Sequence, residues 1–276
     1  MSTQHAYERK GVLLDITGVS FARNGVPILR DVNAQIRDVV RPGAAQGQIV
    51  GLLGPSGVGK TTLFKILAGL TPPDSGTVKI GAEGVPAAPG LVGVVAQNYV
   101  LFDHRSVLGN LVVAARQAGM SGADAKAAGL KYLERFGLQE HADKFPIQLS
   151  GGQRQRVAIA QQLLCSEHYL VMDEPFSGLD VIQQENVQSF LQEVSAADEE
   201  STLIIVTHDV SAAVAVCDTI WLMGRDRTPT GEVIPGARIV EEFDLIERDL
   251  CWHPDIRKRP GYHQLVDEIK ERFHTL

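Results

Sequence analysis

The chain has 276 residues, of which 44% are hydrophobic and 21% charged, and its formal net charge at pH 7 is -7. This composition is that of a globular protein with a substantial core, and it argues against intrinsic disorder. The negative charge gives no general electrostatic reason to bind nucleic acid, because phosphate neutralisation dominates that affinity. We therefore expect no nucleic-acid partner, and a nucleotide or another protein is favoured.

Neither a membrane span nor a disulfide framework is indicated. No apolar run approaches the roughly 18 residues that cross a bilayer, and the first ten residues are polar. Cys165, Cys217 and Cys251 are scattered thiols without paired spacing, which argues against a zinc site and fits a reducing compartment. The sequence therefore predicts a cytoplasmic chain.

The first predicted elements are two antiparallel strands. Apolar positions alternate over residues 12–20 and 28–37, and the turn-like Arg23-Asn24-Gly25 separates them. Residues 39–46 contain Pro42 and Gly43, which suggest a hairpin extension. These strands predict a small β layer.

A glycine-rich stretch follows the apolar run at 49–53. It reads Gly54-Pro55-Ser56-Gly57-Val58-Gly59-Lys60-Thr61-Thr62 and fits the pattern G-x-x-x-x-G-K-[ST]. Its glycines let successive N–H groups point inward at phosphate oxygens, and the following helix adds its positive N-terminal end. The pattern predicts a phosphate-binding loop in which Lys60 reaches the β- and γ-phosphates and Thr61 binds Mg²⁺.

Helical and strand patterns alternate through the rest of the chain. Strands are predicted at 77–80, 92–95, 169–172 and 202–206, and alanine-rich helical segments without strand signal fill residues 106 to about 162. Val187, Phe190, Leu191 and Val194 recur at helical spacing. This order predicts an α/β fold, a parallel sheet with helices on both faces, carrying an inserted helical subdomain. Beyond Gly224, a strand at 238–242 and a short C-terminal amphipathic helix are expected.

Two carboxylates directly follow the apolar strand at 169–172. Such a pair alone is more often a solvated strand end, but the phosphate loop upstream favours a functional role. We expect Asp173 to hold Mg²⁺, partly through water, and Glu174 to point at the γ-phosphate and polarise the attacking water.

Leu149-Ser150-Gly151-Gly152-Gln153 matches the signature of ATP-binding cassette proteins, and the other motifs of that family occur in order. Gln97 matches the Q-loop, Ser177-Gly178-Leu179-Asp180 the D-loop, and His208 the switch histidine. The chain resembles this family over roughly residues 13–224. The resemblance implies a P-loop NTPase core and a nucleotide-binding domain over residues 11–225, with a C-terminal extension over 226–276.

The resemblance also implies how the motifs work together. Ser150, Gly151 and Gly152 are expected to open a helix and present N–H groups and a hydroxyl to a phosphate. In the family this signature, with Gln153, faces the phosphate loop of a second copy. The resemblance therefore implies a head-to-tail dimer with two ATP molecules sandwiched between the copies. In this dimer the D-loop residue Asp180 belongs to the nucleotide site.

Two further residues take their roles from the resemblance. His208 would contact the γ-phosphate and link it to Glu174, and its position directly after a predicted strand fits a ligand-facing residue. Gln97 would serve both catalysis and Mg²⁺ binding.

Residues 173–180 and 236–242 resemble importer ATPases of the nitrate, sulfonate and taurine type. This resemblance implies an ATPase that powers import of a small polar or anionic solute through a separate membrane permease. A solute-binding protein would be a further partner, and the chain would lie peripherally on the inner face of the cell membrane.

Three other classes of protein share the phosphate loop. Cassette proteins of DNA repair carry coiled coils or zinc modules between the loop and the carboxylate strand, whereas the stretch between Lys60 and Asp173 has no heptads or cysteine pairs. Translation factors of this kind need two tandem cassettes, and the loop pattern occurs once. A P-loop kinase does not explain the signature. The soluble, non-transport cassette ATPase is the alternative that we keep.

The adenine site departs from the family pattern. Arg23 falls where family members usually have an aromatic residue, and Phe21 lies two residues earlier. Alternation along a strand predicts that both side chains share a face. We expect Arg23 to lay its planar guanidinium on the base, with Phe21 as the alternative stacking residue or as part of the core.

Overall fold

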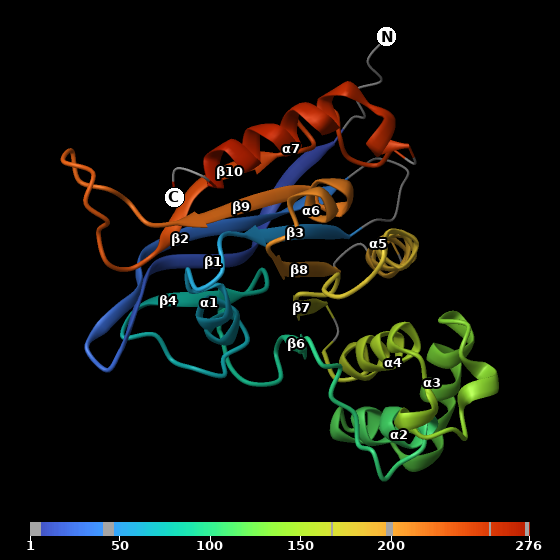
Figure 1. Cartoon of the computed structure of the whole chain (residues 1–276). Helices are drawn as coiled ribbons and strands as arrows, with labels where there is room; N and C mark the ends of the chain where they lie inside the picture. Colours follow the sequence, from blue (N-terminus) through green and yellow to red (C-terminus); the bar gives the residue numbers. More distant parts are fainter. Residues whose placement is uncertain (1–6, 41–46, 167, 197–200, 254, 274–275) are drawn as a thin grey trace.

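The computed structural model describes residues 7–276 except 41–46, 167, 197–200, 254 and 274–275. Most of the predicted hairpin extension at 39–46 therefore lies outside the described residues. Two sheets form the centre of the molecule, and a group of helices projects from one end (Figure 1). No helix in the described part of the chain is both long and apolar enough to cross a membrane.

The first sheet is antiparallel, with strand order β2-β1-β4-β5. Its strands are β1 (Glu8–Arg23), β2 (Val26–Val40), β4 (Ser75–Ile80) and β5 (Val85–Pro86). Asn24 and Gly25 both have positive φ, at 53° and 79°, as a tight two-residue hairpin turn requires. The two predicted N-terminal strands are confirmed, and each is longer than the alternation suggested.

The second sheet has the order β10-β9-β3-β8-β7-β6. Neighbours from β9 to β6 pair in parallel, and β10 joins the edge antiparallel to β9. The strands are β3 (Gln48–Leu53), β6 (Gly93–Val95), β7 (Tyr169–Asp173), β8 (Thr202–Thr207), β9 (Thr219–Gly224) and β10 (Arg238–Asp244). The predicted parallel sheet is confirmed, while β9 was not foreseen.

Alternate residues of the central strands face two different cores. In β8, Ile204 and Val206 contact the core beneath the antiparallel sheet, whereas Leu203 and Ile205 contact the core under the helices. Both faces are thus covered, so β3 and β8 are buried at every residue and read as continuous apolar runs. The covering helices are α1 (Lys60–Leu67), α5 (Val181–Ser195), α6 (Val210–Val216) and α7 (Pro260–Phe273).

The projecting group consists of α-helices that follow β6 in the chain (Figure 1). They are α2 (Val107–Gln117), α3 (Gly122–Arg135) and α4 (Gly151–Leu163), and they fall within the stretch where the sequence predicts helices. Each begins after a serine whose hydroxyl accepts a backbone N–H, namely Ser106, Ser121 and Ser150. Fully buried Asn110 accepts from Phe102 N at 2.7 Å and so fixes the chain that enters α2.

Candidate functional site

The glycine-rich loop joins the carboxyl end of β3 to the first turn of α1. Gly57 and Gly59 have φ values of 76° and 116°, a backbone conformation that favours glycine. A Cβ on Gly59 would also lie 3.3 Å from the carbonyl oxygen of Ile28 in β2. The loop can therefore pack against the antiparallel sheet while leaving the N-terminus of α1 available to an anion.

Lys60 is buried at the start of α1. Its ammonium donates to the carbonyl oxygens of Gly54 and Pro55, at 2.7 and 3.1 Å. Burial lowers the pKa of Lys60, and the nearby charges of Glu174 and Asp173 oppose this shift. The structure thus places the ammonium inside the loop and within electrostatic reach of both predicted catalytic-site carboxylates.

Asp173 ends β7, next to the end of β8. Burial and then repulsion from Glu174 raise the pKa of its carboxyl, and the charges of Lys60 and Lys65 only partly offset this. A half-buried carboxylate whose charge is incompletely balanced suits a divalent cation, for which oxygen is the preferred ligand. Thr61, the other predicted Mg²⁺ ligand, is exposed at the N-terminal turn of α1.

Glu174 is fixed from the end of β8. Its backbone N–H donates to the carbonyl of Val206 at 2.7 Å, and its φ of 50° lies in the left-handed region. One carboxylate oxygen accepts the hydroxyl of Thr207 at 3.0 Å, and the other lies 2.8 Å from Nδ1 of His208. The structure therefore brings Glu174 and His208 together, as the sequence predicts.

The Q-loop and D-loop lie against each other. Exposed Gln97 donates through Nε2 to the hydroxyl of Ser177 at 3.3 Å. Asp180 precedes α5 and accepts the N–H of Gln183 at 2.8 Å, so it caps that helix. In the single chain, the Gln97 side chain is thus hydrogen-bonded to the D-loop, and the Asp180 side chain to the start of α5.

The signature residues begin α4, as predicted. The Ser150 hydroxyl accepts Gln153 N–H at 3.3 Å, and the Gln153 amide oxygen accepts Ser150 N–H at 2.9 Å, which is a reciprocal cap. Gly151 and Gly152 have open space where a Cβ would stand. A cavity of about 360 Å³ lies beside them, between α4 and α5. Figure 1 shows that α4 belongs to the projecting group, apart from the loop between β3 and α1.

Phe21 and Arg23 have different surroundings. Phe21 packs against the core beneath the antiparallel sheet, whereas Arg23 is exposed beside the hairpin turn. A register shift in the pairing with β2 lies between Phe21 and Ala22, so the regular ladder assumed from alternation is interrupted there. The core role weighed for Phe21 thus matches its packing, and Arg23 is free to contact a ligand.

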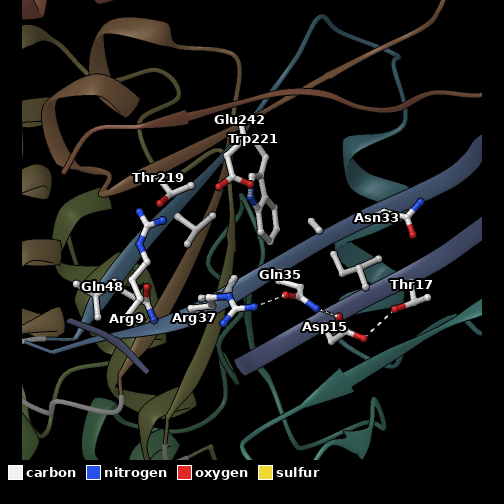
Figure 2. A pocket seen from close by; sticks show the side chains of 15 residues that line it. Arg9, Asp15, Thr17, Asn33, Gln35, Arg37, Gln48, Thr219, Trp221 and Glu242 are labelled. Atoms are coloured by element: carbon white, nitrogen blue, oxygen red, sulfur yellow. Dashed lines mark hydrogen bonds between the residues drawn. The ribbon is translucent and has the colours of Figure 1, made fainter. Parts of the chain in front are cut away.

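A cavity of about 480 Å³ lies elsewhere, beside the antiparallel sheet (Figure 2). It is lined by Gln48 and Thr219, the first residues of β3 and β9, so it adjoins the amino ends of these strands. Arg37, Gln35 and Asp15 form a hydrogen-bonded row along it. None of the predicted nucleotide residues lines this cavity. Ligands of open α/β sheets bind at the carboxyl ends of the strands, so the phosphate loop remains the better site.

Sequence reasoning missed two residues that hold the site. Thr207 donates to Glu174, and the only available signal was its place between a buried strand and His208. Arg225 follows β9 and donates to the carbonyl of Gly57 in the phosphate loop at 3.4 Å. Its place at the carboxyl end of a strand would have marked it, had β9 been foreseen.

Known proteins match this chain extensively. The ABC transporter family profile matches residues 40–177. The taurine import ATP-binding protein TauB of Yersinia pestis is 36% identical over 211 residues, covering 76% of this chain and 79% of that protein. The uncharacterized ABC transporter ATP-binding protein YtlC of Bacillus subtilis is 32% identical, covering 90% and 92%. The sulfate/thiosulfate import ATP-binding protein CysA of Escherichia coli is 34% identical, covering 83% and 64%.

A solved structure supports the fold. CbiO1 from Clostridium perfringens, part of the ABC transporter complex cbiONQ, superposes with a TM-score of 0.71 at 24% identity, covering 96% of this chain and 98% of that one. Phosphate loop, paired carboxylates, switch histidine and signature thus occur on the expected architecture. The chain belongs to the ABC transporter family and is an ATP-binding, ATP-hydrolysing subunit coupled to transport.

Proposed function

We propose that two copies of this chain pair head to tail and close on two ATP molecules, and that this closure powers solute import. The observation that carries the proposal is the separation of the two half-sites in one chain. The phosphate loop lies between β3 and α1, whereas the signature cap at Ser150 opens α4 in the projecting helical group (Figure 1). A two-fold pair brings each half-site to the other copy and closes the assembly.

Within each composite site the residues have separate roles. Lys60 and the loop N–H groups would bind the β- and γ-phosphates, and Asp173, Thr61 and Gln97 would hold Mg²⁺, which neutralises phosphate charge. Glu174, held between Thr207 and His208, accepts hydrogen-bond donors on both carboxylate oxygens. This fixes its orientation toward an attacking water.

The remaining contacts come from the partner copy. Ser150, Gly151, Gly152 and Gln153 would bind the γ-phosphate across the interface, with Asp180 close by. Their open cavity beside α5 supports this role, because no other described part of the chain fills it.

Import is supported by the relatives, several of which are import ATP-binding proteins for taurine, spermidine/putrescine and sulfate. We infer a small polar or anionic solute, a separate membrane permease and an extracytoplasmic solute-binding protein as partners. The chain would then work at the cytoplasmic face of the cell membrane.

Glu174→Gln tests the proposal. The amide oxygen can still accept from Thr207, so the variant should fold and bind ATP, but an amide cannot polarise water as a carboxylate does. The stalled protein should elute as a dimer with ATP and Mg²⁺ and as a monomer without ATP. Light scattering during size exclusion measures this, and a monomer at saturating ATP and Mg²⁺ would count against the pair.

A further inference from the structure

Three separate segments meet at the backbone carbonyl of Pro175, the residue after Glu174. The Tyr99 hydroxyl donates to this oxygen at 3.3 Å, and Nε2 of Gln155 donates to it at 3.1 Å. A carbonyl oxygen has two lone pairs, so these two donors saturate it. Pro175 is buried, which makes the loss of either donor costly.

The two donors come from elements with different partners. Tyr99 lies in the loop after β6, two residues beyond Gln97, and a turn closed by its N–H on the carbonyl of Ala96 shapes that loop. Gln155 lies in the first turns of α4, two residues beyond Gln153, and is only 2% exposed. The junction therefore joins the Q-loop and the signature helix to the Pro175–Phe176 peptide, one residue beyond Glu174.

Two residues at this junction, one in the Q-loop and one just before Pro175, have an uncommon backbone conformation. Tyr99 and Glu174 have φ values of 47° and 50°, which residues other than glycine hold only when their surroundings fix them. Glu174 is tied to Val206 through its N–H, while the Pro175–Phe176 peptide, one residue further along, is tied through the Pro175 carbonyl. The glutamate is thus held on both sides, by β8 at its own N–H and by the junction at the carbonyl of the next residue.

We propose that Tyr99 and Gln155 are positioning residues for ATP hydrolysis, acting through Pro175 on the orientation of Glu174. The proposal rests on the role of Glu174 given above. Any movement of the Q-loop or of α4 changes the donors on this carbonyl, so the water-polarising group responds to both. The Tyr99 hydroxyl is protonated at neutral pH, as an ordinary phenol is, and burial raises its pKa further.

Tyr99→Phe removes one donor and keeps the ring. We expect kcat to fall about 3- to 10-fold, the effect of one hydrogen bond, while the Kd for ATP changes less than about 2-fold. Tyr262→Phe is the matched control, because the Tyr262 hydroxyl likewise donates to a backbone carbonyl, that of Ser211, at 3.0 Å. It should lower the melting temperature to a similar degree and leave kcat unchanged.

Gln155→Leu removes the second hydrogen-bond donor and keeps a side chain of similar volume. The double variant, Tyr99→Phe with Gln155→Leu, completes a double-mutant cycle. Because both donors act on one peptide, the double loss in kcat should be clearly smaller than the product of the single losses. A wild-type kcat in Tyr99→Phe, a loss matched by Tyr262→Phe, or multiplicative losses would each overturn the proposal. If Gln155→Leu does not fold, Tyr99→Phe and its control decide alone.

The experiments distinguish a failure of the catalytic role of Glu174 from a failure of the positioning role of Tyr99. Were Glu174→Gln to hydrolyse ATP at the wild-type rate, the assignment of Glu174 would fail whatever Tyr99→Phe does. If Glu174→Gln is inactive and Tyr99→Phe is not impaired, only the positioning role is refuted.

Discussion

Replacing Lys60 with methionine removes the charge at the centre of the phosphate loop and keeps most of the buried stem. In the nucleotide-free protein this breaks two hydrogen bonds, to the carbonyls of Gly54 and Pro55. Hydrogen bonds to charged groups contribute about 1.5 to 3 kcal/mol each, but burying an ammonium costs a comparable amount. Because burial already lowers the pKa of Lys60, we expect the free energy of unfolding to change by less than about 2 kcal/mol.

Hydrolysis should respond far more strongly than stability. A preorganised group that stabilises developing charge contributes about 2.7 to 4 kcal/mol, so kcat/KM should fall about 10²- to 10³-fold. Phosphate release at saturating Mg²⁺ measures the rate, and calorimetric titration measures ATP affinity. Lys65→Met is the control, because Lys65 lies on the same helix and acts on Asp173 from an exposed position. Wild-type turnover in Lys60→Met, or an equal loss in Lys65→Met, would refute the reasoning.

Three other changes test the predicted metal ligand and the base site. Because the pKa of Asp173 is raised in the folded protein, its ionisation lowers the stability of the fold as pH rises through that pKa. Without nucleotide, Asp173→Asn should therefore melt at a higher temperature than wild type at pH 7, and this difference should disappear below about pH 3.9, the pKa of an unfolded aspartate. The same variant should lose Mg²⁺-dependent hydrolysis. A lower melting temperature at pH 7 would contradict this. Arg23→Ala should weaken ATP and GTP binding alike, by about 0.5 to 2 kcal/mol, whereas Phe21→Ala should mainly lower the melting temperature because Phe21 packs against the core. Loss of nucleotide affinity only in Phe21→Ala would assign the stacking to Phe21.

Local patterns predicted the elements that carry strong periodicity or a fixed motif. The buried runs at β3, β7 and β8 and the phosphate loop between β3 and α1 could be placed from the sequence, because burial on both faces leaves continuous apolar strands. Strand β9 was missed although Thr219–Gly224 is as apolar as its neighbours. It follows the short helix α6 almost directly, and no turn signal separates them.

The contacts that orient the site could not be predicted in the same way. The junction at Pro175 joins residues 99, 155 and 175, and the position of one relative to another depends on how α4 packs beside the sheet. The loop partner Arg225 depends on β9 lying next to β3, which is a pairing between distant segments. The spacing of the motifs indicates which residues take part in the reaction. The pairing of distant segments decides which other residues hold them in place.

The central claim, that each site is shared between two copies, is tested most directly by mixing two inactive variants. In the proposed arrangement, Lys60→Ala would disable the phosphate loop, and Gly151→Asp would place a carboxylate against the γ-phosphate, where like charges repel. In a head-to-tail pair of one copy of each, one site carries both lesions and the other carries neither. A 1:1 mixture should therefore recover up to about a quarter of wild-type hydrolysis, because half of randomly formed pairs are mixed and each has one intact site. If the mixture is no more active than either variant alone, phosphate loop and signature do not meet across two copies, and the shared-site account is contradicted.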